Sequence, residues 1–222
     1  MSILVYRDKA RACAAAATMV ASCVIEKPSI VLGFDWEPEL WPTYRTLVRM
    51  TADGLLDWSD TRTFNLYEHV QADSAQLCET QLRANFYDYV NIIPENRARP
   101  ATSGANWGVI CHDYEDAILN VGGIDTILCA IRSDGSVAYN LGAQELAPVT
   151  HVERAGQGRV VTVGMATIMS AKRVVAVMMG SDKADVAGLV CSGSITPGIP
   201  ASYLQMHVNA ILILDEDAAQ RI

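Results

Sequence analysis

The sequence has few positive charges and no long apolar run. Its 17 lysines and arginines are outnumbered by 25 aspartates and glutamates, and the net charge is −8. Proteins that bind nucleic acid neutralise its phosphates with an excess of lysine and arginine side chains, and this chain has no such excess. The composition therefore argues against nucleic acid as a partner. No apolar stretch reaches the roughly 20 residues that a membrane span requires. We therefore expect neither nucleic acid nor a membrane among the partners.

The sequence also lacks clustered cysteines. No Cys-x-x-Cys pair occurs, and the six cysteines are scattered at Cys13, Cys23, Cys78, Cys111, Cys129 and Cys191. Most lie in apolar surroundings, where a free cysteine behaves as a small hydrophobic residue. This spacing predicts reduced thiols in a cytoplasmic protein, with no metal site and no cofactor. The alanine-rich residues 10–24 follow a strand-like hexamer and charged residues, so we expect a helix there rather than a signal sequence.

Half of the 222 residues are hydrophobic, which is enough for a full core. Apolar runs typical of buried strands alternate with segments of helical periodicity. The expected strands are residues 1–6, 29–34, 61–66, 126–131, 173–179 and 210–214, and the other expected helices are residues 43–53, 75–89, 107–121 and 183–190. This alternation predicts an α/β fold with a doubly wound, mostly parallel sheet and helices on both faces. We expect a single domain over residues 1–222, with a surface loop at residues 143–158 where Gly, Pro and Gln break any period.

Residues 128–141 have the outline of an active-site loop. The apolar run Leu-Cys-Ala-Ile ends in the polar turn Arg-Ser-Asp-Gly-Ser. Ligands bind at the carboxyl ends of strands in open parallel sheets. The stretch resembles the loop Gly-Gly-Ile-Gly-x-Asp-Gly-His-Ile-Ala-Phe-Asn-Glu-Pro of glucosamine-6-phosphate deaminases. The matching residues are Asp134, Gly135, Ala138 and Asn140.

Other segments resemble the same family in the same order along the chain. They are Phe-Asn-Leu-Tyr-Glu-His-Val at residues 64–70, Cys-His-Asp-Tyr-Glu at 111–115, Val-Thr-Val-Gly-Met at 161–165, Gly-Ser-Asp-Lys-Ala at 180–184 and Ile-Pro-Ala-Ser-Tyr-Leu-Gln-Met-His at 199–207. The resemblance covers nearly the whole chain. It implies the family's α/β fold and the family's reaction, which converts an amino-sugar 6-phosphate to a ketose phosphate and releases ammonia.

The catalytic positions that the resemblance defines are altered. Tyr67 replaces the aspartate that transfers a proton in the family. Ser136 replaces the family's ring-opening histidine, and Leu141 replaces the glutamate that supports this histidine. A phenol with a pKa near 10 is a poor base at neutral pH. Asp134 is retained, and Glu68 follows the position of the lost aspartate. The candidate catalytic residues are therefore Asp134, Tyr67, Glu68 and Ser136.

The phosphate-binding turn is altered as well. Where the family has Thr-Gly-Ser-Thr-Pro, residues 35–42 read Asp-Trp-Glu-Pro-Glu-Leu-Trp-Pro. A carboxylate about 5 Å from a phosphate charge costs roughly 3 kcal/mol at an effective dielectric of 20. A helix N-terminus contributes less than about 2 kcal/mol in return. The turn is thus expected to repel phosphate unless its carboxylates point away.

Two features bear on what remains of the phosphate site. The segment that carries the family's phosphate-binding arginine is shortened by on the order of 20 residues, an unusual difference for a loop. Arg154 or Arg159 is available as a substitute, and Lys183 is retained at the family's phosphate-facing lysine. The candidate ligand-binding residues are Asp35, Trp36, Gly135, Asn140 and Lys183.

Several residues have a second interpretation. Asp35, Glu37 and Glu39 either hold a cation or amine or form a solvated acidic face, and the latter is favoured. Trp36 and Trp41 either fill the former pocket or form a contact surface. Asp134-Gly135 either contacts a substrate hydroxyl or simply forms a turn. Tyr67 is expected to be an ordinary strand-end tyrosine, Glu68 and His69 solvated neighbours, and His207 structural.

The replacement of the proton-transfer aspartate, the ring-opening histidine and its supporting glutamate, together with the acidic turn, predicts a catalytically impaired relative of glucosamine-6-phosphate deaminase that binds a ligand or a partner protein. The alternative is an active isomerase, deaminase or lactonase with a rearranged site and an altered substrate. The expected ligand is a small sugar or sugar-phosphate-like molecule. The sequence leaves a homo-oligomer open.

Overall fold

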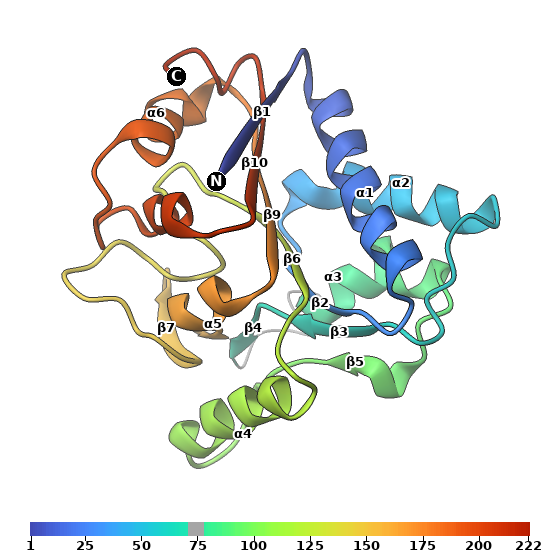
Figure 1. Cartoon of the computed structure of the whole chain (residues 1–222). Coiled ribbons are helices and arrows are strands. Elements are labelled where there is room, and N and C mark those ends of the chain that lie inside the picture. The colour runs from blue at the N-terminus through green and yellow to red at the C-terminus, as the bar shows by residue number, and fades with distance from the viewer. Residues whose placement is uncertain (71–77) are drawn as a thin grey trace.

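The computed structural model describes residues 1–70 and 78–222, and these form two sheets (Figure 1). Within the described residues, the larger sheet has seven strands in the order β1-β10-β9-β6-β2-β3-β5, and all their pairings are parallel. The strands are β1 (Ser2–Tyr6), β2 (Val31–Phe34), β3 (Arg62–Asn65), β5 (Arg97–Ala98), β6 (Thr126–Ala130), β9 (Arg173–Met178) and β10 (Ala210–Asp215). The predicted parallel α/β fold is confirmed.

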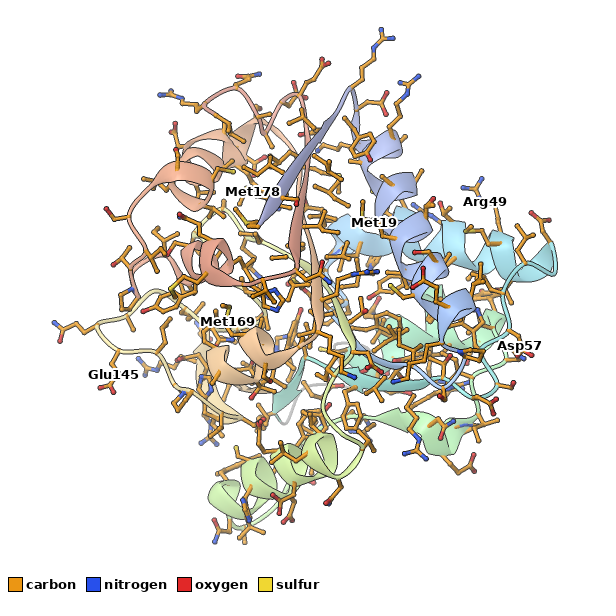
Figure 2. The ribbon with its side chains drawn as sticks, viewed as in Figure 1. Met19, Arg49, Asp57, Glu145, Met169 and Met178 are labelled. Carbon is orange, nitrogen blue, oxygen red and sulfur yellow. The ribbon has the colours of Figure 1, made fainter. Side chains whose placement is uncertain are left out.

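Helices cover both faces of this sheet, because alternate strand residues point to opposite sides. Leu128 packs with the helices α1 and α2, whereas its neighbour Ile127 packs with α4, α5 and α6. Figure 2 shows Met19 on α1, on one side of the sheet, and Met178 on β9. The helices are α1 (Lys9–Glu26), α2 (Trp41–Ala52), α3 (Cys78–Asn85), α4 (Trp107–Asn120), α5 (Met165–Ser170) and α6 (Ala184–Ser192).

Side-chain caps fix where two of the long helices begin. The Asp8 carboxylate accepts the N–H of Arg11 at 2.9 Å before α1, and Asn106 accepts the N–H of Gly108 at 3.0 Å before α4. Such caps satisfy donors that have no partner inside the helix. The helix expected at residues 75–89 is observed as α3 followed by a 3-10 helix, Tyr87–Tyr89, and residues 75–77 lie outside the described part. None of the described helices is long and apolar enough to cross a membrane.

A small antiparallel sheet was not expected. It has the order β4-β8-β7, with β4 (Tyr67–Val70), β7 (His151–Ala155) and β8 (Gly158–Thr162). The prediction of a loop over residues 143–158 is therefore wrong for His151–Ala155. This strand is short and partly exposed, so it lacks a buried strand's apolar run. Its pairing begins at a turn in which Gly156 has a φ of +59°, a conformation that favours glycine.

The small sheet positions residue 67 at the end of the large one. The chain leaves β3 at Asn65 and enters β4 at Tyr67 after one residue, Leu66. The N–H of Leu66 donates to the carbonyl of Phe34 at 2.9 Å, and its carbonyl accepts the N–H of Val163 at 2.9 Å. Leu66 thus joins the two sheets, and Tyr67 lies where the carboxyl ends of β2 and β3 meet the small sheet.

At the opposite end of the sheet, Asp125 holds the starts of three strands together. Its carboxylate accepts the N–H of Val31 at 2.9 Å and pairs with Lys27 at 2.6 Å and Lys172 at 2.7 Å. Its own carbonyl accepts the N–H of Arg173 at 2.9 Å. Asp125 is 7% exposed and Val31 is 4% exposed, so the strand N–H that the carboxylate accepts lies in the core.

Replacing this carboxylate is expected to destabilise the fold. We expect Asp125→Ala to lower the free energy of unfolding by about 2–3 kcal/mol, because it leaves the buried N–H of Val31 without its acceptor. Lys27→Ala, which removes only a half-exposed cation, is expected to cost less than about 1 kcal/mol. Urea unfolding of both variants measures the difference. Equal costs would show that the lysine pairs, not the strand contact, give Asp125 its role.

Candidate active site

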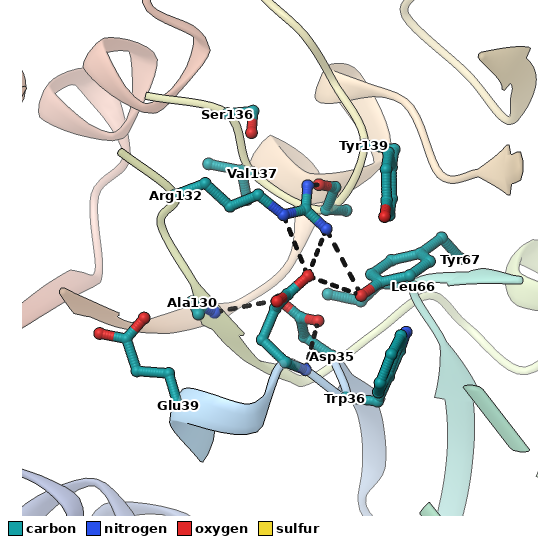
Figure 3. A network of polar contacts seen from close by, with 12 residues as sticks. Asp35, Trp36, Glu39, Leu66, Tyr67, Ala130, Arg132, Ser136, Val137 and Tyr139 are labelled. Carbon is teal, nitrogen blue, oxygen red and sulfur yellow. Dashed lines mark hydrogen bonds and ion pairs between the residues drawn. The ribbon is translucent and has the colours of Figure 1, made fainter. Parts of the chain in front are cut away.

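Five charged side chains converge at the carboxyl ends of the central strands. The loop after β2 supplies Asp35, Glu37 and Glu39, the loop after β6 supplies Arg132, and the turn after β9 supplies Lys183. Figure 3 shows the guanidinium group of Arg132 extending toward Tyr67, whose hydroxyl lies 3.4 Å from its Nη2. The two loops meet there because β2 and β6 are neighbours in the sheet. This edge is the place where parallel sheets bind ligands.

Arg132 is the centre of this arrangement. Its Nε donates to Oε1 of Glu37 at 3.0 Å, and further guanidinium N–H groups donate to Glu37 and to the carbonyl of Ala138. The guanidinium carbon lies 3.9 Å from the centre of the Tyr139 ring, a cation–π contact. Burial disfavours the cation, but Tyr67, Asp35 and Glu37 outweigh it and raise the pKa of Arg132. Arg132 is thus a fixed, neutralised cation.

Sequence reasoning missed the Glu37–Arg132 pair. A signal was present, because the deaminase loop has glycine where this chain has Arg132. A glycine leaves space at a ligand-binding strand end, whereas the arginine side chain fills it. Both members of the pair are about one-fifth exposed, at 22% for Glu37 and 21% for Arg132.

Tyr67 is a hydrogen-bond donor in this site. Its hydroxyl donates to Oε1 of Glu37 at 2.9 Å, and its ring packs edge-on against Tyr139 at 4.6 Å between centroids. The residue is 1% exposed, and burial raises the pKa of Tyr67 well above its ordinary value. The phenol therefore keeps its proton at neutral pH.

Asp35 is buried rather than solvated. Oδ2 accepts the N–H of Ala130 at 3.1 Å, Oδ1 accepts the N–H of Glu37 at 3.2 Å, and the residue is 1% exposed. The first bond extends the β2–β6 ladder beyond the last strand residue. Burial, and next the charge of Glu37, raise the pKa of Asp35 to about 6. The hydroxyl of Tyr44 donates to the backbone carbonyl of Asp35 and holds the turn in place.

Glu39 forms an ion pair with the retained lysine, Lys183. One carboxylate oxygen accepts the N–H of Met179 at 2.7 Å, and the other forms an ion pair with Lys183. The two side chains are 17% and 11% exposed. Burial raises the pKa of Glu39, and the charge of Lys183 opposes the shift. The prediction that Asp35, Glu37 and Glu39 form a solvated acidic face is wrong, because each carboxylate has turned inward to a specific partner.

The loop residues Asp134, Gly135 and Ser136 form a self-contained turn. Oδ1 of Asp134 accepts the N–H of Ser136 at 2.9 Å and its hydroxyl at 2.6 Å. Gly135 has a φ of +78°, and a Cβ there would lie 2.8 Å from Ile199. Of the two interpretations of Asp134-Gly135, a substrate contact or a turn, these hydrogen bonds are the ones that a turn makes. The hydroxyl of Ser136 is buried and already donates to Asp134.

Glu68 points away from Tyr67 and into the start of α3. Its carboxylate accepts the N–H groups of Cys78 at 2.6 Å, Glu79 at 3.0 Å and His69 at 3.1 Å. The residue has no exposed surface, so the expectation of a solvated Glu68 is wrong. A carboxylate at the start of a helix accepts hydrogen bonds from N–H groups that have no partner inside the helix. Glu68 therefore stabilises the start of α3.

Aromatic rings border the charged cluster. The ring of Trp36 lies 6.3 Å from that of Tyr67 and 6.2 Å from that of His69, and its Nε1 is buried without a partner in the described part of the chain. Trp41 donates through Nε1 to the carbonyl of Trp36 at 3.2 Å. His69 also packs against Tyr139 at 5.6 Å, and burial lowers the pKa of its imidazole. The two indoles are partly buried, as expected for side chains that fill a former pocket.

The remaining candidates lie around this cluster. Asn140 donates to the carbonyls of Val137 at 3.0 Å and Val163 at 2.9 Å and so ties the loop to the end of β8. The ring of His207 is bonded to the carbonyl of Ala171 at 2.8 Å, which fits the expected structural role. Arg154 and Arg159 lie on β7 and β8, with the Arg159 guanidinium 5.5 Å from the ring of Trp107. Within the described residues, no group of three or more His, Cys, Asp or Glu side chains is placed to hold a metal ion.

The raised pKa of Asp35 predicts a pH dependence of stability. A carboxyl with a folded-state pKa near 6 and an unfolded-state pKa near 3.8 stabilises the fold while protonated, and this contribution is lost as the pH rises through about 6. Between about pH 5 and pH 7, the wild type is expected to lose about 1 kcal/mol relative to Asp35→Asn.

Urea unfolding of both proteins at the two pH values measures this change. Asparagine keeps an acceptor oxygen but cannot ionise, so the pH responses of other groups cancel in the difference. Parallel curves for the two proteins would show that Asp35 ionises as readily in the fold as in the unfolded chain.

Comparison with known proteins gives the family. Residues 40–213 match the family model described as glucosamine-6-phosphate isomerases/6-phosphogluconolactonase. The chain is 31% identical to the glucosamine-6-phosphate deaminase of Halothermothrix orenii, over 99% of both chains, and 29% identical to that of Clostridioides difficile, over 100% of this chain and 97% of the relative.

Solved structures show the same fold. A monomeric glucosamine-6-phosphate deaminase superposes with a TM-score of 0.95 at 23% identity, with both chains fully covered. The 6-phosphogluconolactonase of Trypanosoma brucei superposes with a TM-score of 0.81 at 18% identity, over 100% of this chain and 98% of that one. Given the match of the family model and of relatives over their whole length, this chain belongs to the glucosamine-6-phosphate isomerase/6-phosphogluconolactonase family.

Proposed function

We propose that this chain is a family member that does not deaminate glucosamine 6-phosphate and that acts by binding a small ligand or a partner protein. The proposal rests on the observation that both cations of the site, Arg132 and Lys183, already form ion pairs within the chain. Lys183 is paired with Glu39 and Arg132 with Glu37, so residues 35–42 neutralise the charges that would attract a phosphate.

A phosphate group has to displace a carboxylate to reach Lys183. Displacing Glu39 from Lys183 leaves the poorly solvated carboxylate without its cation, and leaving one charge of a buried pair without its partner typically costs about 3–5 kcal/mol. The displaced carboxylate remains close to the incoming anion, since Glu39 also accepts the N–H of Met179. These costs support a site that disfavours phosphate.

Proton transfer also lacks a suitable group. Tyr67 stays protonated and donates to Glu37, while the hydroxyl of Ser136 is bonded to Asp134. Asp35 has a pKa near neutrality, but its oxygens accept backbone N–H groups and the residue is 1% exposed. An effective general base must lie within hydrogen-bond reach of the proton that it removes. None of these groups offers a free basic atom.

A ligand of low charge fits this environment better than a sugar phosphate. A hollow of about 350 Å³ beside the Glu39–Lys183 pair is bordered by Lys9, Pro38 and Met179. Its two lysines are balanced by Glu39 and Asp182, and this balance suits the hydroxyls of a neutral sugar or an amino sugar. We also propose a cytoplasmic location, which the six free cysteines support.

One observation favours the alternative of an active enzyme with a rearranged site. His69 is half-buried beside Tyr67 and Tyr139, and burial lowers the pKa of its imidazole. A neutral imidazole at neutral pH can accept a proton. Under this alternative, His69 is the base of an isomerase, deaminase or lactonase with an altered substrate.

Activity assays separate the two proposals. We expect purified protein to release no ammonia from glucosamine 6-phosphate above the blank, because a tyrosine that keeps its proton replaces the proton-transfer aspartate and Lys183 is paired with Glu39. The control is a family deaminase that has the aspartate, histidine and glutamate in place. Turnover that disappears in Tyr67→Phe would contradict the impaired reading, whereas turnover of 6-phosphogluconolactone or a neutral sugar that disappears in His69→Gln would establish the alternative.

A further inference from the structure

A second hollow lies on the outer side of the first helices. It has a volume of about 550 Å³ and is lined by α1, α2, α3 and the 3-10 helix that follows them, with Cys13 from α1, Pro42, Arg45 and Arg49 from α2, Asn85 from α3 and Tyr89. Volumes of about 300–1,000 Å³ are typical of small-molecule sites. Figure 2 shows Arg49 extending outward from α2. Neither arginine takes part in the charged cluster at the sheet edge.

The two arginines form a pair of cations without an acidic partner. They are four residues apart on α2, so they lie on the same face of the helix, one turn apart. Arg49 donates to the hydroxyl of Thr46 at 3.2 Å, and neither guanidinium is in an ion pair within the part of the chain that the structure describes. Like charges at this spacing repel each other by a few tenths of a kcal/mol. A bound anion removes that repulsion.

The charge of the residues that line this hollow differs from that of four other hollows among the described residues. No aspartate or glutamate is among its described residues, although the chain has a net charge of −8. Four other hollows among the described residues each contain at least one carboxylate, namely Glu145, Asp60, Glu39 and Glu115. The hollow at α2 is therefore a cationic site on an acidic protein.

We propose that this hollow binds a phosphate monoester with a ring-sized organic body. Guanidinium groups bind phosphate oxygens in pairs of parallel hydrogen bonds, and a dianion matches two arginines. The organic body has apolar walls from Cys13, Pro42 and neighbouring alanines, and Tyr89 is 60% exposed and offers a ring face for stacking. A nucleoside 5′-monophosphate and a hexose 6-phosphate share this chemistry.

The site is distinct from the Glu39–Lys183 pair but adjoins it. Cys13 and Pro42 line both this hollow and the one beside Lys183. The proposal does not depend on whether the sheet edge is catalytic, because its anchors are Arg45 and Arg49. Variants of these anchors and of Lys183 therefore distinguish the two sites.

Calorimetric titration with adenosine 5′-monophosphate, fructose 6-phosphate and inorganic phosphate tests the proposal. We expect at least one ester to bind the wild type more tightly than inorganic phosphate does. Arg45→Ala combined with Arg49→Ala should weaken that binding at least about tenfold, since each charge-assisted bond is strong. The affinity should also fall as salt is added. The two esters reveal whether a nucleoside or a sugar body fits.

Three variants serve as controls. Arg62→Ala removes an exposed arginine of β3 that lines another hollow, and Lys183→Met removes the lysine at the sheet edge. Both should leave the binding unchanged, and Arg45→Lys with Arg49→Lys should restore part of it in a protein that keeps the charge.

The proposal is overturned by several results. The first is that neither ester binds the wild type at about 5 mM, a concentration above ordinary KM values. The second is that the esters bind no more tightly than inorganic phosphate. The third is that Arg62→Ala weakens ester binding as much as the double alanine variant does, or that only Lys183→Met weakens it. The last result would assign the ester to the sheet edge. Circular dichroism of the double alanine variant confirms that a loss of binding does not come from unfolding.

Discussion

Charges brought to the end of a parallel sheet must be neutralised, and the site of this protein depends on how that is done. The turn after β2 carries Glu37 and Glu39, and they pair with Arg132 and Lys183 from the loops after β6 and β9. The four side chains are 11–22% exposed, so water screens them poorly and each pair holds its two loops together. Asp35, whose Oδ2 accepts the N–H of Ala130, anchors the same turn to β6. The ligand end of the sheet is thus closed by contacts within the chain.

This closure connects the sequence changes to one another. A glycine-to-arginine change at residue 132 would leave a poorly solvated cation at the strand end, and Glu37 supplies its counter-charge. Tyr67 then donates to Glu37, in place of the proton-transfer aspartate that the deaminase pattern has there. The retained Lys183 would attract phosphate, but Glu39 takes its charge. Tyr67, Glu37 and Arg132 look independent in the sequence but form one hydrogen-bonded group, and the same turn after β2 supplies Glu39 to Lys183. This connection supports a common shift in function rather than a loss of single groups.

Much of the fold was predictable from the sequence, because its signals are local. Apolar runs and helical periods predicted every strand of the large sheet among the described residues except the two-residue β5, and they predicted most helix positions. The family motifs placed Asp35, Lys183 and the loop at residues 128–141 near one site. The missed features depend on contacts between distant segments. Arg132 and Glu37 are 95 residues apart, and Glu68 finds its partners ten and eleven residues later, in α3. The strand β7 is stabilised by its hydrogen bonds to β8, and its sequence lacks the apolar run of a buried strand. The antiparallel sheet could therefore not be predicted from the sequence.

The closed site depends on Glu39 as the internal counter-ion of Lys183. A double-mutant cycle with Glu39→Gln, Lys183→Met and the double variant measures this directly through the free energy of unfolding. Glutamine keeps an acceptor for the N–H of Met179, so the cycle isolates the charge pair. We expect the double variant to be more stable than the sum of the single costs implies, by about 1–3 kcal/mol. Additive costs, with a coupling near zero, would contradict it and would mean that Lys183 is free to hold a phosphate.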